Sequence, residues 1–319
     1  MTAGPDPIPV LRLRNLSKAF GEVKAVDGLS LDVFPGEIFG FLGPNGAGKT
    51  TTIRMMCGLL RPDSGSVEIA GRGEPSRPSF RKESIGLSPQ SVIVWESLTC
   101  REQLEFMGSM YGLDGPTSRR RSLELLEAFG LQEKRNKLGK TLSGGMQRRL
   151  NIALALVHEP EILFLDEPQA GLDPQSRVLV RELIRRLAPR TTVILTTHDM
   201  EEAEKLSDRV CILDHGRLLV LDTVAGLKRR LGQGDLVEVE IAEDIRQSLL
   251  PYVPSPGRPG PGLGFQGGIL RLVPDEAAEV LPRILQVIKD RGLHLLNLRI
   301  RQKTLEDVFI HLTGRGLRE

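Results

Sequence analysis

The stretch Gly43-Pro44-Asn45-Gly46-Ala47-Gly48-Lys49-Thr50 determines how the rest of the chain is interpreted. It fits the pattern G-x-x-x-x-G-K-[ST] of phosphate-binding loops. The apolar residues 37–42 before it predict a buried strand, and residues 51–60 after it predict a helix. A glycine-rich turn ahead of a helix could carry the same letters, but this strand–loop–helix context favours a nucleotide site.

The residue types of this loop suit anionic oxygens. Glycines let the backbone turn several N–H groups inward, and the start of the following helix adds partial positive charge. Lys49 can bring a cation to the outer phosphates, and the Thr50 hydroxyl can hold Mg²⁺. The loop therefore predicts a nucleotide with its metal.

Composition bounds the class of protein. The 319 residues carry a net charge of +2, with 40% hydrophobic and 26% charged residues, which is typical of a soluble globular protein of two domains. Near-neutral charge gives no support for nucleic acid as a partner, and the basic runs 119–121 and 228–230 are interpreted as solvated faces. Three cysteines without metal spacing predict reduced thiols in or near the core of a cytosolic protein; they are Cys57, Cys100 and Cys211.

We expect no signal peptide at residues 1–9. Residues 1–9 lack both a basic region and an apolar core, and we expect a disordered leader there. No apolar run approaches the length that spans a bilayer. A role at a membrane would therefore require a partner.

Strand patterns flank the loop on both sides. Residues 10–16, 25–33 and 65–70 predict strands. Phe20 lies in a turn-prone stretch, where an exposed aromatic could stack on a base, although a core phenylalanine is the alternative. Residues 85–90 predict a strand that ends at Gln90, which alone would be an ordinary surface residue.

The next segments predict helices. Thr99 and Glu102 have the form of a capping box, and a second helix is expected over residues 118–129. Residues 142–146, Leu-Ser-Gly-Gly-Met, precede an amphipathic pattern. Ser143, Gly144 and Gly145 at a helix start could form a second anion site, although a plain N-cap is the alternative.

Two carboxylates end a buried strand. Residues 162–165 are all apolar, as in a central parallel strand, and Asp166 and Glu167 follow them. Ligands of open α/β sheets bind at such strand ends. Asp166 could hold the Mg²⁺ shell and Glu167 could deprotonate a water, although a solvated strand end is the alternative. After a turn at residues 171–174 and a helix, residues 191–196 predict another strand, and His198 beyond it could touch a γ-phosphate.

These segments occur in the order of the motifs of the ATP-binding cassette ATPases, and residues 10–225 resemble that family. The matching motifs are the Walker A loop (43–50), the Q-loop (Gln90), the signature (142–146), Walker B (162–167), the D-loop (171–173, with Asp173) and the H-loop (His198). The resemblance implies an α/β fold with a P-loop NTPase core, a mostly parallel sheet, an antiparallel β subdomain and a helical insertion. It places the cassette at 10–229, its helical subdomain at about 91–158, and a small C-terminal α+β domain at 230–319.

The resemblance also implies the site and its chemistry, with ATP and Mg²⁺ as cofactors. Two cassettes, identical or different, would dimerise head to tail with two ATP molecules between them. One chain would contribute Phe20, Gly43, Pro44, Asn45, Gly46, Ala47, Gly48, Lys49, Thr50, Thr51 and Gln90 to each ATP, and the other Ser143, Gly144, Gly145 and Asp173. Thr50, Gln90 and Asp166 would hold Mg²⁺, and Glu167, His198 and Lys49 would act in catalysis.

The end of the chain narrows the resemblance. Residues 304–314 are similar to the ending of exporter ATPases of the daunorubicin-resistance type. This implies a separate membrane permease of about six helices, and a location at the cytoplasmic face of the cell membrane. Two departures are Gln169, where the family usually has threonine, and Phe20, where tyrosine is commoner. The transported substrate stays open.

Other nucleotide proteins fit less well. A soluble cassette ATPase acting on nucleic acid or ribosomes is the alternative, but the gap of about 90 residues between the loop and the signature lacks heptads, and the chain has one ATPase core. A P-loop kinase or GTPase gives no reason for residues 142–146.

The C-terminal region shows no catalytic constellation. Strands are expected at 236–241, 269–273 and 295–300, with a helix at 275–291 and a loop at 251–268. Pro282 could kink that helix or delay its start. The last helix begins at a capping box of Thr304 and Asp307 and has an apolar stripe of Leu305, Val308, Phe309 and Leu312. We expect this domain to steady the dimer or to tune the contact with the permease.

Overall fold

The computed structural model describes residues 8–69, 84–188, 190–232, 235–241, 264–266, 269–272, 274–292 and 294–313. The chain divides into two compact units, Met1–Leu221 and Asp222–Glu319. Most of the leader expected at 1–9 and of the loop expected at 251–268 lies outside the described residues. The domain limits inferred from the resemblance stay predictions.

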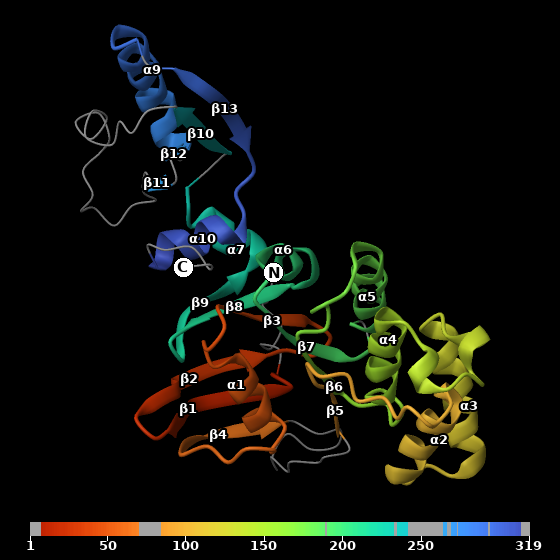
Figure 1. Cartoon of the computed structure of the whole chain (residues 1–319). Coiled ribbons are helices and arrows are strands. Elements are labelled where there is room, and N and C mark those ends of the chain that lie inside the picture. Colours follow the sequence, from red (N-terminus) through yellow and green to blue (C-terminus); the bar gives the residue numbers. More distant parts are fainter. Residues whose placement is uncertain are drawn as a thin grey trace, which may run out of the picture. The chain divides into compact units, whose positions relative to one another are not determined.

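A six-stranded sheet forms the centre of the first unit (Figure 1). In their order across the sheet the strands are β5 (Ile85–Ser88), β6 (Ile162–Asp166), β7 (Thr192–Thr197), β3 (Ile38–Leu42), β8 (Arg209–Asp214) and β9 (Arg217–Thr223). The pairs from β5 to β8 are all parallel. Every residue of β3, β6 and β7 is buried, as expected for parallel strands covered on both faces. The α/β fold class is therefore confirmed.

A second, antiparallel sheet packs beside the first. It has the order β2-β1-β4, with β1 at Leu11–Phe20, β2 at Val23–Val33 and β4 at Ser64–Ile69. The buried leucines of β1 belong to one hydrophobic cluster with Phe39 and Phe41 of β3. The β1 strand runs four residues beyond its expected end at residue 16, so Phe20 is the last residue of a strand.

Most α-helices described in the first unit begin at a residue whose side chain caps them, whereas the helix that starts at Lys49 follows Gly48 and has no side-chain cap. The helices are α1 (Lys49–Met56), α2 (Cys100–Met110), α3 (Gly115–Ala128), α4 (Gly144–Leu154), α5 (Pro174–Leu187) and α6 (Met200–Leu206). The capping box of Thr99 and Glu102 is confirmed at α2. The α1 helix ends before the expected residue 60, because Gly58 adopts a positive φ of 67°.

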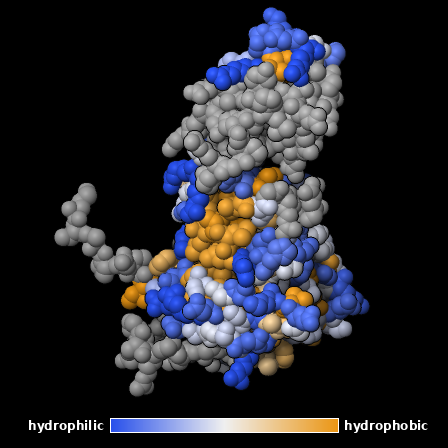
Figure 2. Space-filling view, turned by 90° about the vertical axis from the view of Figure 1, so that its left-hand side faces the viewer, coloured by the Kyte–Doolittle hydropathy of each residue, from blue (hydrophilic) through white to orange (hydrophobic). Residues whose placement is uncertain are grey.

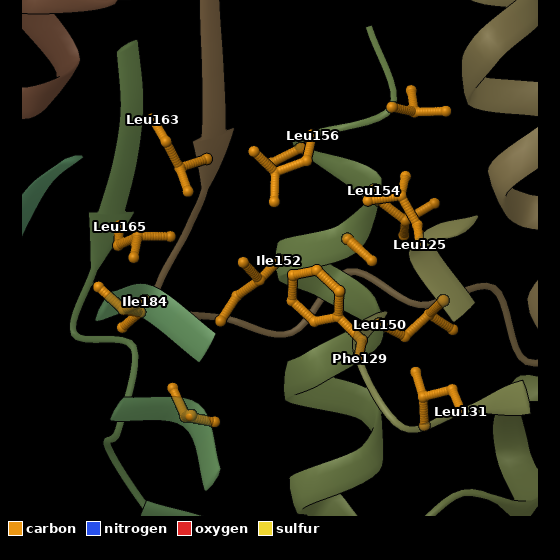
Figure 3. Packing of buried hydrophobic residues seen from close by; sticks show 14 of the residues in the cluster. Leu125, Phe129, Leu131, Leu150, Ile152, Leu154, Leu156, Leu163, Leu165 and Ile184 are labelled. Atoms are coloured by element: carbon orange, nitrogen blue, oxygen red, sulfur yellow. The ribbon is translucent and has the colours of Figure 1, made fainter. Parts of the chain in front are cut away.

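One hydrophobic cluster joins the helical segment to the parallel sheet (Figure 3). Ile152 of α4 points toward Leu163 and Leu165 of β6, whereas Leu150 lies near Phe129 at the end of α3. All five side chains are fully or almost fully buried. The α4 helix, which carries residues 144–154, is therefore packed on both sides.

The three cysteines are free and buried, as predicted. Burial raises the pKa of the Cys57 thiol to about 12 and also raises the pKa of Cys211. These thiols are therefore protonated at neutral pH and poor nucleophiles.

The surface of the molecule is mixed in character. On the face shown in Figure 2, a contiguous hydrophobic area lies among mostly hydrophilic residues. Among the described residues, no helix combines the length and the apolar character that crossing a bilayer requires.

The second unit contains a four-stranded antiparallel sheet of order β11-β12-β10-β13. Its elements are α7 (Val224–Arg229), β10 (Leu236–Ile241), β11 (Gly264–Gln266), β12 (Ile269–Leu272), α9 (Pro274–Asp290), β13 (Leu295–Arg301) and α10 (Leu305–Thr313). The α9 helix runs through Pro282, so its start is not delayed. The expectation of a loop at 251–268 is wrong at β11, because pairing with β12 makes this short segment a strand.

The last helix has the expected cap. The backbone N–H of Thr304 donates to Oδ2 of Asp307 at 2.8 Å, and the N–H of Asp307 donates to Oγ1 of Thr304 at 3.4 Å. Leu305, Val308 and Phe309 are buried, whereas Leu312 is 40% exposed. The predicted apolar stripe is thus buried over its first two turns.

Candidate nucleotide-binding and hydrolysis site

The glycines of residues 43–50 lie where no side chain fits. Gly46 and Gly48 have φ values of 82° and 98°, which residues with a side chain rarely adopt. A Cβ on Gly48 would collide with the carbonyl oxygen of Ala25, and one on Gly43 with that of Leu213. The loop therefore lies directly against its neighbours and passes straight into α1.

Lys49 is buried inside this loop. Its side-chain Nζ donates hydrogen bonds to the carbonyl oxygens of Gly43 at 2.7 Å and Pro44 at 3.0 Å. Burial lowers the pKa of Lys49, and the carboxylates of Glu167 and Asp166 oppose that effect. The loop thus holds a cation close to two carboxylates in a region of low solvent exposure.

Asp166 at the end of β6 is surrounded by hydroxyl groups. Thr50 Oγ1 donates to Asp166 Oδ1 at 3.2 Å and Oδ2 at 3.1 Å, and Thr196 Oγ1 donates to Asp166 Oδ1 at 2.5 Å. Carboxylate and hydroxyl oxygens are ligands that Mg²⁺ accepts, together with phosphates and water. No cluster of three or more His, Cys, Asp or Glu side chains suited to a metal occurs in the described residues. The donor set therefore fits a cation shared with phosphates rather than an all-protein cage.

Glu167 has an unusual backbone that aims its side chain. Its φ is 49°, and its N–H donates to the carbonyl oxygen of Thr196 at 3.2 Å and to Thr196 Oγ1 at 3.0 Å. Such a conformation costs roughly 1–3 kcal/mol and is typical of functional sites. Glu167 Oε1 lies 2.9 Å from His198 Nδ1, which places His198 beside the carboxylate. The pair could activate a water at the edge of the sheet.

The signature residues begin α4. Ser143 is the N-cap, and its Oγ accepts a hydrogen bond from the N–H of Met146 at 3.3 Å. Ser143 and Gly144 are exposed, whereas Gly145 lies against Ser176 at the start of α5. Asp173 caps α5 by accepting from the N–H of Ser176 at 3.0 Å, and hydrogen bonds from Ser176 lower the pKa of Asp173. The signature and the D-loop are therefore neighbours.

Two further predicted residues are exposed. Phe20 is 53% exposed, which contradicts a core phenylalanine and leaves its ring able to stack on a base. Its ring centroid lies 5.8 Å from Lys18 Nζ. Gln90 is exposed just after β5. The roles assigned to Phe20, Gln90 and the other site residues stay predictions.

Sequence reasoning missed two polar residues of this region and gave no account of the burial of a third, Gln169. Arg148 and Asn151 of α4 are almost completely buried, although the helical pattern was interpreted only through its apolar positions. Gln169 is also buried, and neither polar atom of its side-chain amide has a hydrogen-bond partner among the described residues. It lines a cavity of about 120 Å³ together with Glu167 and His198, so this departure from the family lies beside two predicted catalytic residues.

Comparison with known proteins identifies the family. Residues 26–170 match the family model described as ABC transporter. The chain is 38% identical to the linearmycin resistance ATP-binding protein LnrL of Bacillus subtilis (strain 168), over 97% of this chain and 100% of that protein. It is 37% identical to the daunorubicin/doxorubicin resistance ATP-binding protein DrrA of Streptomyces peucetius, over 97% and 94%. It is 38% identical to the Nod factor export ATP-binding protein I of Paraburkholderia xenovorans (strain LB400), over 98% and 100%.

Solved structures agree with this assignment. A structure titled as the ATP-binding subunit of an ABC transporter is 29% identical, with a TM-score of 0.61, and the match covers 70% of this chain and 93% of that one. CbiO1 from Clostridium perfringens, part of the ABC transporter complex cbiONQ, is 28% identical with a TM-score of 0.61, over 67% and 88%. The chain therefore belongs to the ABC transporter family, as an ATP-binding and ATP-hydrolysing subunit of the daunorubicin-resistance type.

Proposed function

We propose that this chain powers a membrane exporter, and that ATP drives two cassettes together to do so. The observation that carries the proposal is the division of the site into two parts. Lys49, Asp166 and Glu167 lie buried near the carboxyl ends of the inner strands β3 and β6. Ser143 and Gly144, in contrast, are exposed at the start of α4. A second cassette, arranged head to tail, would bring its own helix start to the ATP held by the first.

Different residues of one chain would bind the nucleotide and activate the attacking water. Lys49 and the N–H groups of the loop would bind the phosphates, and Phe20 would stack on the adenine. Mg²⁺, held by Thr50, Asp166 and Gln90, would neutralise charge that develops on the phosphates. Glu167 would orient and deprotonate the attacking water, with His198 holding the γ-phosphate beside it.

We propose that the permease docks in an apolar groove of the first unit. The groove has a volume of about 300 Å³ and is lined by residues of β5, the edge strand of the parallel sheet, and of the helices α2 and α4. Its lining includes Leu59, Ile93, Trp95, Met107 and Tyr111. Leu59 is 65% exposed and Ile93 is 52% exposed, so the groove offers apolar surface to a partner. The chain would thus lie at the cytoplasmic face of the cell membrane.

The names of the relatives indicate in which direction the proposed transport would run. They refer to resistance to linearmycin and daunorubicin and to the export of Nod factor. We therefore propose export, with the permease selecting the cargo. The C-terminal domain, expected at residues 230–319, would steady the cassette dimer or tune the contact with the permease.

Co-isolation tests this function directly. The tagged Glu167→Gln chain would be isolated with ATP from detergent-solubilised membranes of its native cell, because loss of the base should keep ATP and its partners bound. A multi-span membrane protein is the expected companion. Ribosomes, nucleic acid, or no membrane protein would contradict the proposal and favour a soluble cassette ATPase.

A pair of surface variants tests the groove. Leu59→Glu places a charge in the groove and should abolish co-isolation of the membrane protein while ATP still binds. Val178→Glu is the matched control, because Val178 is an exposed apolar residue of α5 outside the groove. Equal co-isolation by both variants would place the permease elsewhere.

A further inference from the structure

Arg148 of α4 binds the backbone that follows β5. Its Nη1 donates a hydrogen bond to the carbonyl oxygen of Pro89 at 2.9 Å, and its Nη2 donates to that of Gln90 at 2.6 Å. The planar guanidinium holds two successive carbonyl groups, which a lysine could not do in the same geometry. The backbone at Gln90 is thereby tied to the helix that begins with the signature.

Asn151, three residues further along α4, binds the same segment at two points. Its Nδ2 donates to Ser88 Oγ at 2.8 Å, and its Oδ1 accepts from the N–H of Ile93 at 3.2 Å. Residues three apart on a helix share a face. Arg148 and Asn151 therefore form one clamp on residues 88–93, which we call the α4 clamp.

The clamp is buried and carries a charge. Arg148 is 3% exposed and Asn151 is 4% exposed. Burial lowers the pKa of Arg148, and the negative charges of Asp166 and Glu167 oppose that effect. An apolar side chain could fill this space without the cost of burying a cation. The two carbonyl contacts are what the arginine supplies and an apolar residue cannot.

The α4 helix connects the α4 clamp to the signature residues. Arg148 lies five positions after Ser143, which is a rise of about 7.5 Å along an α-helix. The opposite side of α4 is fixed by the hydrophobic cluster of Figure 3. A single packed helix therefore connects residues 88–93 to its exposed N-cap Ser143.

We propose that Arg148 and Asn151 are positioning residues that couple the groove to the signature of the same chain. This inference rests on the proposed function, in which a permease occupies the groove. Pro89, Ile93 and Asn151 line that groove, so an occupant would press directly on the clamp. The permease would then control where Ser143 is presented to the ATP of the second cassette.

Amide hydrogen exchange of the full chain tests the clamp itself. In Arg148→Met, amides of residues 90–93 should exchange at least tenfold faster than in the wild type, while the dissociation constant of ATP stays within threefold. With ATP in the Glu167→Gln background, the protection gained at residues 143–147 should be lost. Arg149→Met is the matched control, because Arg149 binds the carbonyl oxygen of Phe129 at 2.8 Å and does not contact residues 88–93. Unchanged exchange in both segments would overturn the clamp.

ATPase activity of the complex with its co-isolated permease separates coupling from simple structural support. The ratio of permease-stimulated to unstimulated activity should fall at least tenfold in Arg148→Met, and Arg148→Lys, which keeps the charge but cannot hold both carbonyl groups in the same geometry, should restore part of it. A wild-type ratio in a folded Arg148→Met or Arg148→Lys chain would overturn the coupling. Absence of stimulation in the wild type would instead contradict the exporter function, and the exchange measurement would then decide the clamp alone.

Discussion

The two units of the molecule both bury charged side chains, but they satisfy them differently. In the second unit, Arg301 donates to both carboxylate oxygens of Asp307, at 2.7 and 2.8 Å, and to Glu238 at 2.8 Å. In the first unit, Lys49 donates only to carbonyl groups of its own loop, and no ion pair between described residues joins it to Asp166. Its charge is therefore left largely uncompensated by direct contact.

The difference separates a structural network from a binding site. A cation with two carboxylate partners holds secondary-structure elements together. Removing one partner leaves the remaining charge without its ion pair in an environment of low polarity. A buried cation held by carbonyl groups retains attraction for a further anion, which the phosphates of ATP would supply. Burial alone does not distinguish the two cases; the completeness of pairing does.

The largest effect is expected from the catalytic carboxylate. Glu167→Gln should reduce the rate of ATP hydrolysis about 10²–10⁴-fold, the usual contribution of a general base, while ATP binding is retained. Steady-state phosphate release and equilibrium ATP binding measure the two quantities. Glu127→Gln, on an exposed position of α3, serves as the control. Turnover of Glu167→Gln within tenfold of the wild type would remove Glu167 from this role.

Replacing the two cations with methionine tests the comparison itself. Arg301→Met should lower the free energy of unfolding by about 3 kcal/mol, because it removes the cation that pairs with the buried Asp307 and with the partly buried Glu238. Lys49→Met should change the stability by less than about 1 kcal/mol but weaken ATP binding about 10- to 100-fold. Calorimetry of the full chain and ATP titration give both numbers. Equal losses of stability would erase the distinction between the units.

The pH dependence sharpens the account of the second unit. Burial raises the pKa of Asp307, but hydrogen bonds from Arg301 and Thr304 outweigh it, so the pKa of Asp307 lies below its usual value. The ionised carboxylate therefore stabilises the fold above pH of about 4, and this stabilisation is lost as the pH falls through the lowered pKa.

Asp307→Asn should accordingly cost about 1–3 kcal/mol at pH 7. The difference between this variant and the wild type should shrink as the pH falls below about 4. Unfolding in denaturant at several pH values measures the difference, with Asp290→Asn at an exposed position of α9 as control. A difference that is independent of pH would mean that the charge of Asp307 is not what stabilises α10.

The smallest effect is expected at Phe20. Removing its ring in Phe20→Ala should raise the dissociation constant of ATP about 2- to 10-fold, as expected for one aromatic stacking contact. Val23→Ala, an exposed residue at the start of β2, is the matched control. Identical ATP affinities in the two variants would exclude Phe20 as the adenine platform.

The motifs of the site could be predicted from sequence because their chemistry needs fixed residue types at short spacing. The phosphate loop, the two carboxylates after β6 and the cap at Ser143 are all of this kind. Arg148 could not be predicted, because the carbonyl group of Gln90 that it binds lies 58 residues away in the sequence. The β11 strand was missed for a different reason, because its composition is typical of a loop and only pairing with the neighbouring β12 makes it a strand.

The length of β1 shows a second limit of prediction from sequence. Local patterns predicted the elements, but β1 continues to Phe20 because it pairs with β2 as far as Val23. The buried Gln169 amide is a further case, because only the folded chain places it in a cavity with Glu167. Local chemistry is thus predictable from sequence, whereas strand pairing and the burial of single polar groups are not.

The most direct test of the account is the mass of the Glu167→Gln chain in solution with and without ATP, measured by light scattering during size-exclusion chromatography. We predict that ATP doubles the mass and that Ser143→Arg, which blocks the exposed helix start, prevents the doubling while ATP still binds. A Glu167→Gln chain that binds ATP and keeps its mass unchanged, with and without its permease, would contradict dimerisation of two cassettes as the source of power.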